Sequence, residues 1–164
     1  NHTYLQEISN AELASLFKPV LLQHGVNPED FSDEYITRAV AMVKSRINFV
    51  SELWDHARFF FIAPDSYDAK AVKKRWSAET PAIMTELVDV LEGLDDFSSA
   101  AAEPVVLAWI ADKGYHLGNV MNAFRLAVVG ECKGPHMFDI TELMGCAETV
   151  RRIRIAAERI QIPE

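Results

Sequence analysis

Apolar residues recur every three or four positions along nearly the whole chain, and almost no segment alternates between apolar and polar residues. Spacing of this kind places side chains on one face of an α-helix, whereas strict alternation would place them on one face of a β-strand. The clearest case is the acidic segment that carries Ile83, Leu87, Val90, Leu91 and Leu94. The spacing therefore predicts an all-α protein.

Capping residues and prolines divide this pattern into separate helices. Ser9 and Glu12 have the spacing of a capping box, so a helix is expected to begin there. Pro81 would stand in the first turn of the acidic helix, where its missing N–H costs nothing. Glu103-Pro104 is expected to open a helix that ends at Gly114. Further helices are expected near residues 32–47, 51–61, 117–130, 138–145 and 146–161.

A run of acidic and then small residues near positions 95–103 offers the best boundary within the chain. No internal repeat, low-complexity tract or clear linker offers another. We therefore expect two small packed helical subdomains, residues 1–98 and residues 99–164. The aromatic run Phe59–Phe61 is expected to lie in a core rather than to form a stacking platform.

The chain has 164 residues, enough to bury a hydrophobic core. Its apolar runs are all shorter than the roughly 18 residues that a membrane-spanning helix needs, and no signal peptide opens it. Because the first residue is Asn1 rather than methionine, we expect a fragment of a longer protein. Cys132 and Cys146 offer no disulfide framework and fit a reducing compartment, so a cytoplasmic protein is expected.

The net charge of −8 argues at first against a nucleic-acid partner, but the charge is unevenly distributed. Residues 36–76 contain eight lysines and arginines against four acidic residues, while most of the acidic excess lies elsewhere. Within this basic segment, Lys70, Lys73 and Lys74 have the spacing of one helix face. A basic front and an acidic back can orient a protein on a polyanion, although chance clustering of solvated helix faces would give the same totals.

Residues that carry catalytic or metal chemistry do not assemble into a recognisable motif. Cys132 and His136 are the only close cysteine–histidine pair, and no second pair stands at a zinc-binding spacing. Asp55-His56 could act as an acid–base pair, but a surface helix explains it more simply. No nucleophile elbow or phosphate-cradling glycine loop is present. We therefore expect no metal site, and a binding module rather than a catalyst.

The last third of the chain carries an ordered set of motifs around Arg125. They are Gly114–Gly118, Ala123–Gly130, Gly134-Pro135, Phe138, Met144-Gly145 and Val150–Ile153. The set resembles the C-terminal end of bacterial glutamyl-tRNA synthetases, which carry glycines, an arginine and a Gly-Pro loop in the same order. Upstream, the segment from Tyr35 to Phe61 is similar to the first helical bundle of the family's anticodon-binding region. The resemblance thus covers essentially the whole chain.

Several positions depart from the family's pattern. Its Pro-Leu before the arginine is Ala123-Phe124 here, its threonine before the glycine is Val129, and the lysine after its Leu-Gly pair is Cys146. The family's two ATP-binding signatures are absent altogether. The resemblance therefore implies an anticodon-binding region without the catalytic domain. This chain would need no cofactor and would be inactive by itself, while ATP and Mg would bind the missing domain.

The resemblance also implies which residues meet RNA. Arg125, Gly134, Pro135 and Met137 would face the anticodon of the tRNA for glutamate, with the arginine reading a base edge and the methionine packing on a base face. Arg46 would contact the third anticodon base. Phosphate contacts are expected from four further cations, Arg58, Lys70, Lys73 and Lys74.

Other interpretations of the same residues stay open. Arg125 could be a surface charge that anchors the C-terminal helix, and Arg46 could be a cation favoured by a helix C-terminus. The acidic surface would also suit an all-α protein-interaction module, whereas a stand-alone all-α enzyme is disfavoured by the missing chemistry. We expect a monomer that does not bind membranes. The resemblance fits both a ligase that rejects the tRNA for glutamine and one that accepts it.

Overall fold

The computed structural model describes residues 2–162, and all regular structure within them is helical. This part of the chain contains ten α-helices and four short 3₁₀ turns, and no β-strand occurs in it. The prediction of an all-α protein is confirmed.

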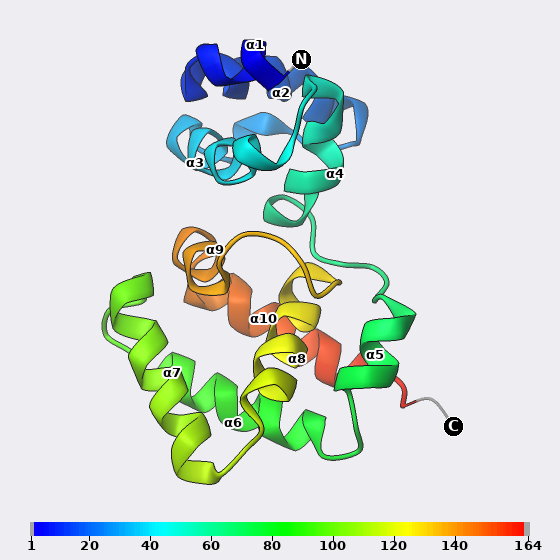
Figure 1. Cartoon of the computed structure of the whole chain (residues 1–164), viewed down its shortest axis with the longest axis vertical. Coiled ribbons are helices and arrows are strands. Elements are labelled where there is room, and N and C mark those ends of the chain that lie inside the picture. Colours follow the sequence, from blue (N-terminus) through cyan, green and yellow to red (C-terminus); the bar gives the residue numbers. More distant parts are fainter. Residues whose placement is uncertain (1, 163–164) are drawn as a thin grey trace. The chain divides into compact units, whose positions relative to one another are not determined.

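The chain divides into two compact units: unit 1 extends to Ile62, and unit 2 begins at Ala63 (Figure 1). This division differs from the one expected between residues 98 and 99. The reason is that the helices between residues 69 and 92 pack against helices of the last third of the chain. The acidic and small residues near position 95 therefore mark a connection inside unit 2.

Unit 1 contains four α-helices joined by 3₁₀ turns. Ser9 caps the second helix, because its hydroxyl oxygen accepts a hydrogen bond from the backbone N–H of Glu12 at 3.0 Å. Ser32 caps the third in the same way, accepting from the N–H of Tyr35 at 3.0 Å. The elements are α1 (His2–Glu7), α2 (Asn10–Gln23), α3 (Asp33–Val43), α4 (Leu53–Ala57) and the turns Pro28–Asp30, Lys44–Arg46, Val50–Glu52 and Arg58–Phe60.

Aromatic rings close the core of unit 1 around Phe61. The ring of Phe61 meets those of Phe17, Phe31 and Tyr35 edge to face, with centroids 5.7, 5.0 and 5.7 Å away. Phe59, Phe60 and Phe61 are all buried. The prediction that this aromatic run belongs to the core is confirmed.

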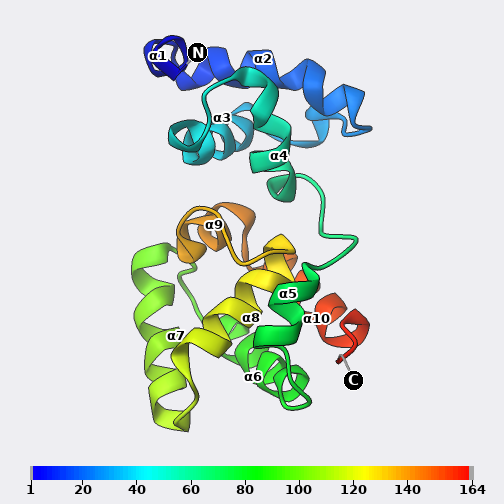
Figure 2. The ribbon, with the colours of Figure 1, turned by 45° about the vertical axis from the view of Figure 1, so that its right-hand side comes forward.

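Unit 2 is built around α8, which contacts α5, α6, α7 and α10 (Figures 1 and 2). Seven of the residues in α8 are buried, including Phe124, whose ring lies 6.1 Å from that of Phe138. A helix that is apolar on most of its surface needs neighbours on several sides, which explains its central place. The elements are α5 (Ala69–Arg75), α6 (Thr80–Glu92), α7 (Ser99–Lys113), α8 (Leu117–Val129), α9 (Met137–Met144) and α10 (Cys146–Arg159).

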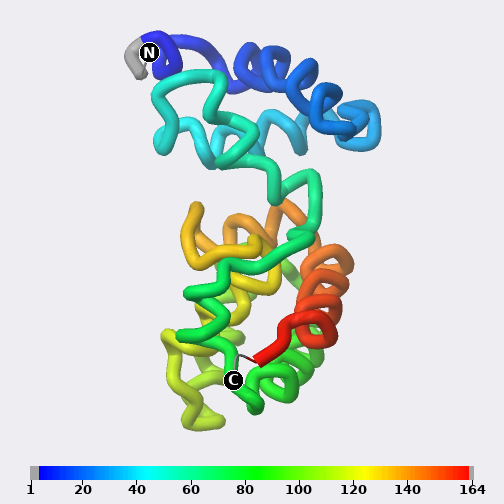
Figure 3. Tube along the Cα trace, turned by 90° about the vertical axis from the view of Figure 1, so that its right-hand side faces the viewer, coloured from blue at the N-terminus to red at the C-terminus, as the bar shows by residue number. Residues whose placement is uncertain are grey.

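The helices α6 and α10 pack along each other in unit 2, as the adjacent green and red segments of Figure 3 show. Each contributes an apolar stripe: Met84, Leu87 and Leu91 are buried on α6, and Val150 and Ile153 on α10. At the exposed edge, the Arg154 guanidinium donates to a Glu92 carboxylate oxygen at 3.0 Å. Packing between residues far apart in sequence therefore fixes the second unit.

Three helices differ in their bounds from expectation. The helix expected near residues 51–61 is α-helical only over α4, Leu53–Ala57, with a 3₁₀ turn on each side. The helix α3 ends at Val43 rather than continuing to Ile47, although Ile47 is still buried after the 3₁₀ turn. The helix α7 begins at Ser99, five residues before Pro104, because the Ser98 hydroxyl caps it and the three alanines that follow favour helix. Pro104 therefore lies inside a helix, where it removes one backbone hydrogen bond.

Replacing Pro104 should stabilise unit 2. Pro104 is exposed, so Pro104→Ala restores an N–H donor to α7 without opening a cavity. Replacing proline also gives the unfolded chain more conformational freedom, which offsets part of the gain in the helix. We therefore expect a net increase of about 1–3 kcal/mol in the free energy of unfolding. Urea denaturation followed by circular dichroism measures it. A loss of stability would mean that α7 begins at Pro104 in solution.

Candidate nucleic-acid interface

The cations and loop residues singled out from the sequence lie in both units. Arg46 and Arg58 belong to unit 1 and are exposed to solvent, Arg46 as the last residue of one 3₁₀ turn and Arg58 as the first residue of another. The others belong to unit 2, on α5, on α8, or on the loop that joins α8 to α9. That second group comprises Lys70, Lys73, Lys74, Arg125, Gly134, Pro135 and Met137.

Arg125 and Gly134 lie against each other in unit 2. Arg125 projects half-buried from α8, and Gly134 follows on the α8–α9 loop. A Cβ atom built on Gly134 would lie 3.3 Å from Nη1 of Arg125, and the φ of Gly134 is +133°. Glycine is needed here both for its backbone conformation and for the space that the guanidinium occupies. Gly134 and the guanidinium thus pack against each other, and Nη1 of Arg125 is buried at this contact.

The α8–α9 loop is tied down at its start. The carbonyl of Gly130 accepts a hydrogen bond of 2.9 Å from the backbone N–H of Asp68, which caps α5. A Cβ atom on Gly130 would approach Cβ of Pro64 to 2.9 Å, at a φ of +93°. The thiol of Cys132 reaches the carbonyl of Asn122 on α8 at 3.5 Å. These contacts fix the backbone that leads to Gly134.

Pro135 and Met137 are buried, unlike Gly134. Only 2% of Met137 is exposed, because it opens α9 and points into the core of unit 2 beside Phe138. This burial does not fit the expected packing of Met137 on a base face. The side chains that this loop presents to solvent are Lys133, His136 and, in part, Glu131.

Arg75 and Asn119 are polar partners near this loop that the sequence did not single out. Nη1 of Arg75 donates to Oδ1 of Asn119 at 3.1 Å, which joins the end of α5 to the start of α8. Burial raises the pKa of the Cys132 thiol, and the positive charges of Arg75 and Arg125 partly offset this. Both guanidinium groups therefore lie near Cys132. The sequence pattern did not indicate Arg75 because this residue does not lie on the helix face shared by Lys70, Lys73 and Lys74.

A cavity of about 330 Å³ opens beside Arg75, between α5, α6 and the start of α8. Lys73, Lys74 and Arg75 line one side, with Glu79 as an acidic neighbour. On the other side, Nδ1 of His116 accepts the backbone N–H of Asn119 at 3.1 Å and caps α8. The positive end of a helix and three cations make this a suitable place for phosphate.

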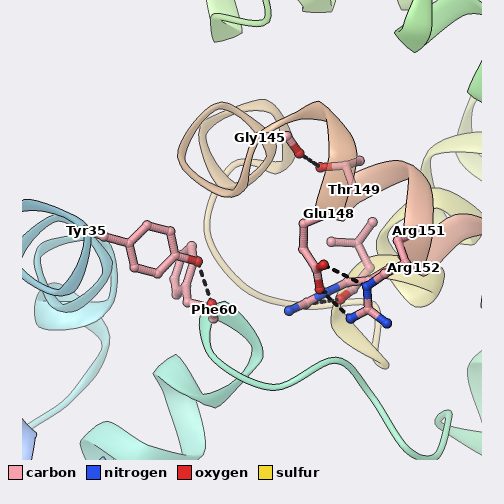
Figure 4. Close-up of polar contacts among 8 residues, drawn as sticks. Tyr35, Phe60, Gly145, Glu148, Thr149, Arg151 and Arg152 are labelled. Atoms are coloured by element: carbon pink, nitrogen blue, oxygen red, sulfur yellow. Dashed lines mark hydrogen bonds and ion pairs between the residues drawn. The ribbon is translucent and has the colours of Figure 1, made fainter. Parts of the chain in front are cut away.

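The C-terminal end of α8 is held by a buried arginine on α10, shown in Figure 4. Arg152 is 3% exposed, and its Nη1 donates to the carbonyl of Val128 at 2.9 Å. Its Nε donates to Glu148 at 2.9 Å, and the exposed Arg151 binds the same carboxylate through two hydrogen bonds of 2.8 and 2.7 Å. The Val128 carbonyl is one of the last four of its helix, which have no partner within the helix. Arg152 therefore fixes the end of the helix that carries Arg125.

In unit 1, Arg46 and Arg58 have different surroundings. Arg46 ends a turn whose first residue, Lys44, donates from its ammonium group to the carbonyl of Ile8 at 2.7 Å. The guanidinium of Arg58 lies 5.7 Å from the centroid of the Trp54 ring, which in turn stacks on the ring of His24 at 4.0 Å. Both arginines are presented by an ordered backbone.

Comparison with known proteins shows which family the chain belongs to. Residues 12–157 match the family described as anticodon binding domain. The chain belongs to that family. The match includes the α8–α9 loop, Arg125 and the turn that carries Arg46, so both groups of candidate residues lie inside the domain.

The most similar curated proteins include two bacterial enzymes named glutamate–tRNA ligase. The domain is 54% identical to the ligase from Phocaeicola vulgatus and 52% identical to the ligase from Bacteroides fragilis. Both alignments cover 96% of the 164 residues of the domain. It spans only 31% of each relative.

Solved structures show the same relationship. The domain is similar to a glutamate tRNA ligase from Elizabethkingia meningosepticum, crystallised in complex with its amino acid, with 38% identity and a TM-score of 0.87 over 98% of the domain. A glutamate-tRNA synthetase from Elizabethkingia anophelis gives 36% identity and a TM-score of 0.80 over 96%. The domain covers 31% and 30% of those chains.

Within the part of the chain that the structure describes, no three histidine, cysteine or acidic side chains gather closely enough to hold a metal ion. None of the described helices combines the length and the apolar character that crossing a membrane requires.

Removing the buried guanidinium should loosen the end of α8. Arg152→Met leaves the Val128 carbonyl and part of the Glu148 carboxylate without their donors, so we expect a loss of about 3–5 kcal/mol in unfolding free energy. Arg151→Met is the matched control, because Arg151 shares Glu148 but is exposed and should cost no more than about 1 kcal/mol. Urea unfolding of both variants tests this, and equal losses would contradict it.

The same cluster should make stability depend on acid. Hydrogen bonds from Arg151, and then from Arg152, lower the pKa of Glu148 in the folded protein. A lowered pKa stabilises the fold above the unfolded value of about 4.3 and loses that effect as pH falls through the folded value. We expect the stability of the Glu148→Gln variant to decrease less below about pH 4.5 than that of the wild-type chain. Glu158→Gln, on the same helix, should leave that fall unchanged.

Proposed function

We propose that this chain recognises the anticodon of the tRNA for glutamate, as the anticodon-binding domain of a glutamate–tRNA ligase. The observation that carries the proposal is the guanidinium of Arg125 lying against the backbone of Gly134, on a loop anchored at Gly130. Membership of the anticodon binding domain family and the similarity to glutamate–tRNA ligases support it.

The chemistry of this surface suits unpaired bases. Proteins read single-stranded RNA loops by splaying out the bases and hydrogen bonding to their edges. The guanidinium of Arg125 offers a planar fork of N–H donors, which fits a base edge or a phosphate. The backbone around Gly134 lies against this guanidinium and offers further polar groups beside it. We assign the first two anticodon positions to this surface of unit 2.

Arg46 supplies the third position in this proposal. Anticodons for glutamate end in C, whereas those for glutamine end in G, so a contact to this base can separate the two tRNAs. The exposed arginine stands at the end of an ordered turn. Its long side chain can reach a base edge, because Lys44 and not Arg46 holds the turn against α1.

The remaining cations provide contacts that are independent of sequence. Lys70, Lys73 and Lys74 are exposed on α5, and Arg58 is exposed in unit 1. We assign these four residues to phosphates of the anticodon arm. About three to five such contacts would give binding that weakens with salt, with a log–log slope of about −2 to −4.

The catalytic steps belong to other parts of the ligase in this proposal. Activation of glutamate with ATP and Mg²⁺, and transfer to the tRNA, would take place in the portion of the ligase that this domain does not span. The domain would act as a cytoplasmic, monomeric recognition module within that chain. Measured turnover by the 164 residues alone would refute this division of labour.

Single-base variants of one tRNA distinguish residues that contact a base edge from residues that contact phosphate. We expect Arg46→Ala to cost about 1–3 kcal/mol in binding of the tRNA with C at the third anticodon position, and little for the variant with G. Arg125→Ala should act at the first two positions instead. Lys73→Ala should weaken all variants equally and make the salt slope about 0.7 shallower. Fluorescence anisotropy at several salt concentrations measures these effects.

Two results would contradict the proposal. If Arg46→Ala left the ratio of affinities for C and G unchanged, Arg46 would be a structural or phosphate-binding residue. If the wild-type domain showed no tRNA binding and no salt dependence, the acidic surface would instead favour an all-α protein-interaction module.

A further inference from the structure

Phe49 is the one exposed phenylalanine among the nine of this chain, all of which the structure describes. Its side chain is 56% exposed, whereas six others are 9% exposed or less, and Phe31 and Phe97 are partly covered. An exposed ring forgoes the stabilisation that burial gives a phenylalanine. Most phenylalanines of this chain are packed inside a unit, whereas the ring of this one is open to a ligand.

The segment that carries Phe49 is held in place on both sides. Ile47 before it is 1% exposed, and Leu53 after it is fully buried. The carbonyl of Phe49 accepts from the N–H of Glu52 at 3.0 Å, and the Glu52 carboxylate accepts from the N–H of Asn48 at 3.4 Å. The ring therefore stands on a fixed backbone, so little ordering entropy is lost when it binds a flat partner.

Arg46 stands three residues before Phe49 and is also exposed. Consecutive Cα atoms are about 3.8 Å apart, so the two Cα atoms lie within about 11 Å of each other. An arginine side chain spans much of that distance. A planar group on the ring of Phe49 would thus have its edge within reach of the guanidinium.

We propose that Phe49 is a stacking platform for an unpaired nucleobase, and that it holds the third anticodon base while Arg46 contacts the edge of that base. This inference rests on the proposed function and adds a residue to it. Aromatic rings bind bases of any identity through their faces, so Phe49 contributes affinity and Arg46 contributes selectivity. The exposed cation three residues before the ring favours RNA over an apolar protein partner.

A fluorescent base can report the stack directly. The probe is an anticodon stem-loop RNA of the tRNA for glutamate, with pyrrolocytosine at the third anticodon position, titrated with the 164-residue chain. We expect binding to quench this base. Phe49→Ala should remove most of the quenching and weaken binding about tenfold, because base–aromatic stacking is typically of that size. Phe49→Tyr keeps the ring and should retain both effects.

Two further variants assign the effect to the ring. Leu22→Ala removes another exposed apolar side chain of unit 1, with 61% exposure, and should change neither affinity nor quenching. Arg46→Ala should reduce selectivity for C while the quenching at saturation persists. Circular dichroism shows whether each variant is folded.

Each other outcome counts against the inference. If Phe49→Ala binds and quenches like the wild-type chain, or binds weakly with unchanged quenching at saturation, Phe49 does not stack on this base. If Phe49→Ala instead abolishes a complex with a protein while RNA binding is intact, the ring belongs to a protein interface. If the wild-type chain does not bind the stem-loop at all, the proposed function fails, and this inference fails with it.

Discussion

A charge buried in unit 2 helps to determine where the α8–α9 loop lies. Removing a guanidinium from water is costly, and only good geometry and satisfied hydrogen bonds offset that cost. Arg152 meets these conditions with a carboxylate on its own helix and a terminal carbonyl of α8. Since the α8–α9 loop starts two residues after Val128, the hydrogen bond from Arg152 helps to fix where the loop begins. A lysine has no planar fork, so it could not bind both partners in the same way.

The acidic net charge of the chain is compatible with an RNA-binding surface. Charges more than about 8 Å apart in physiological salt are largely screened from each other, so an incoming phosphate responds to local groups. The cations Lys70, Lys73 and Lys74 gather on the single helix α5, whereas acidic residues dominate other segments of the chain, such as the exposed Glu29, Asp30, Asp33 and Glu34. Acidic residues elsewhere on a protein discourage nonspecific binding of polyanions. Total charge is therefore a poor guide to the partner of this fold.

Local signals predicted most of the helices, and long-range packing explains what they missed. Ser9 and Thr80-Pro81 mark true helix starts because capping and proline effects act within one turn. The early start of α7 was missed because Glu103-Pro104 looks like a helix start while Ser98 is the actual cap. The division into units depends on contacts between α6 and α10, which are far apart in sequence.

The candidate site was predictable in the same uneven way. A resemblance pointed to Arg125 and Gly134, which the structure brings together. It could not reveal that Met137 is buried or that Arg75 binds Asn119, because both facts depend on the packing of α5 and α9 against α8. Arg152 stood in a basic run that reads as surface charge, and only its burial distinguishes it from Arg151.

Cys132 has a consequence for how the domain withstands oxidative conditions. Its thiol lies near Arg75 and Arg125, and neighbouring cations commonly activate cysteines by favouring the thiolate. Here burial outweighs those charges and raises the pKa, so the sulfur stays protonated at neutral pH. A protonated thiol adds no negative charge beside the arginines and reacts slowly with peroxides, since oxidation proceeds through the thiolate. The surface thus keeps a polarizable group next to its cations without becoming a redox sensor.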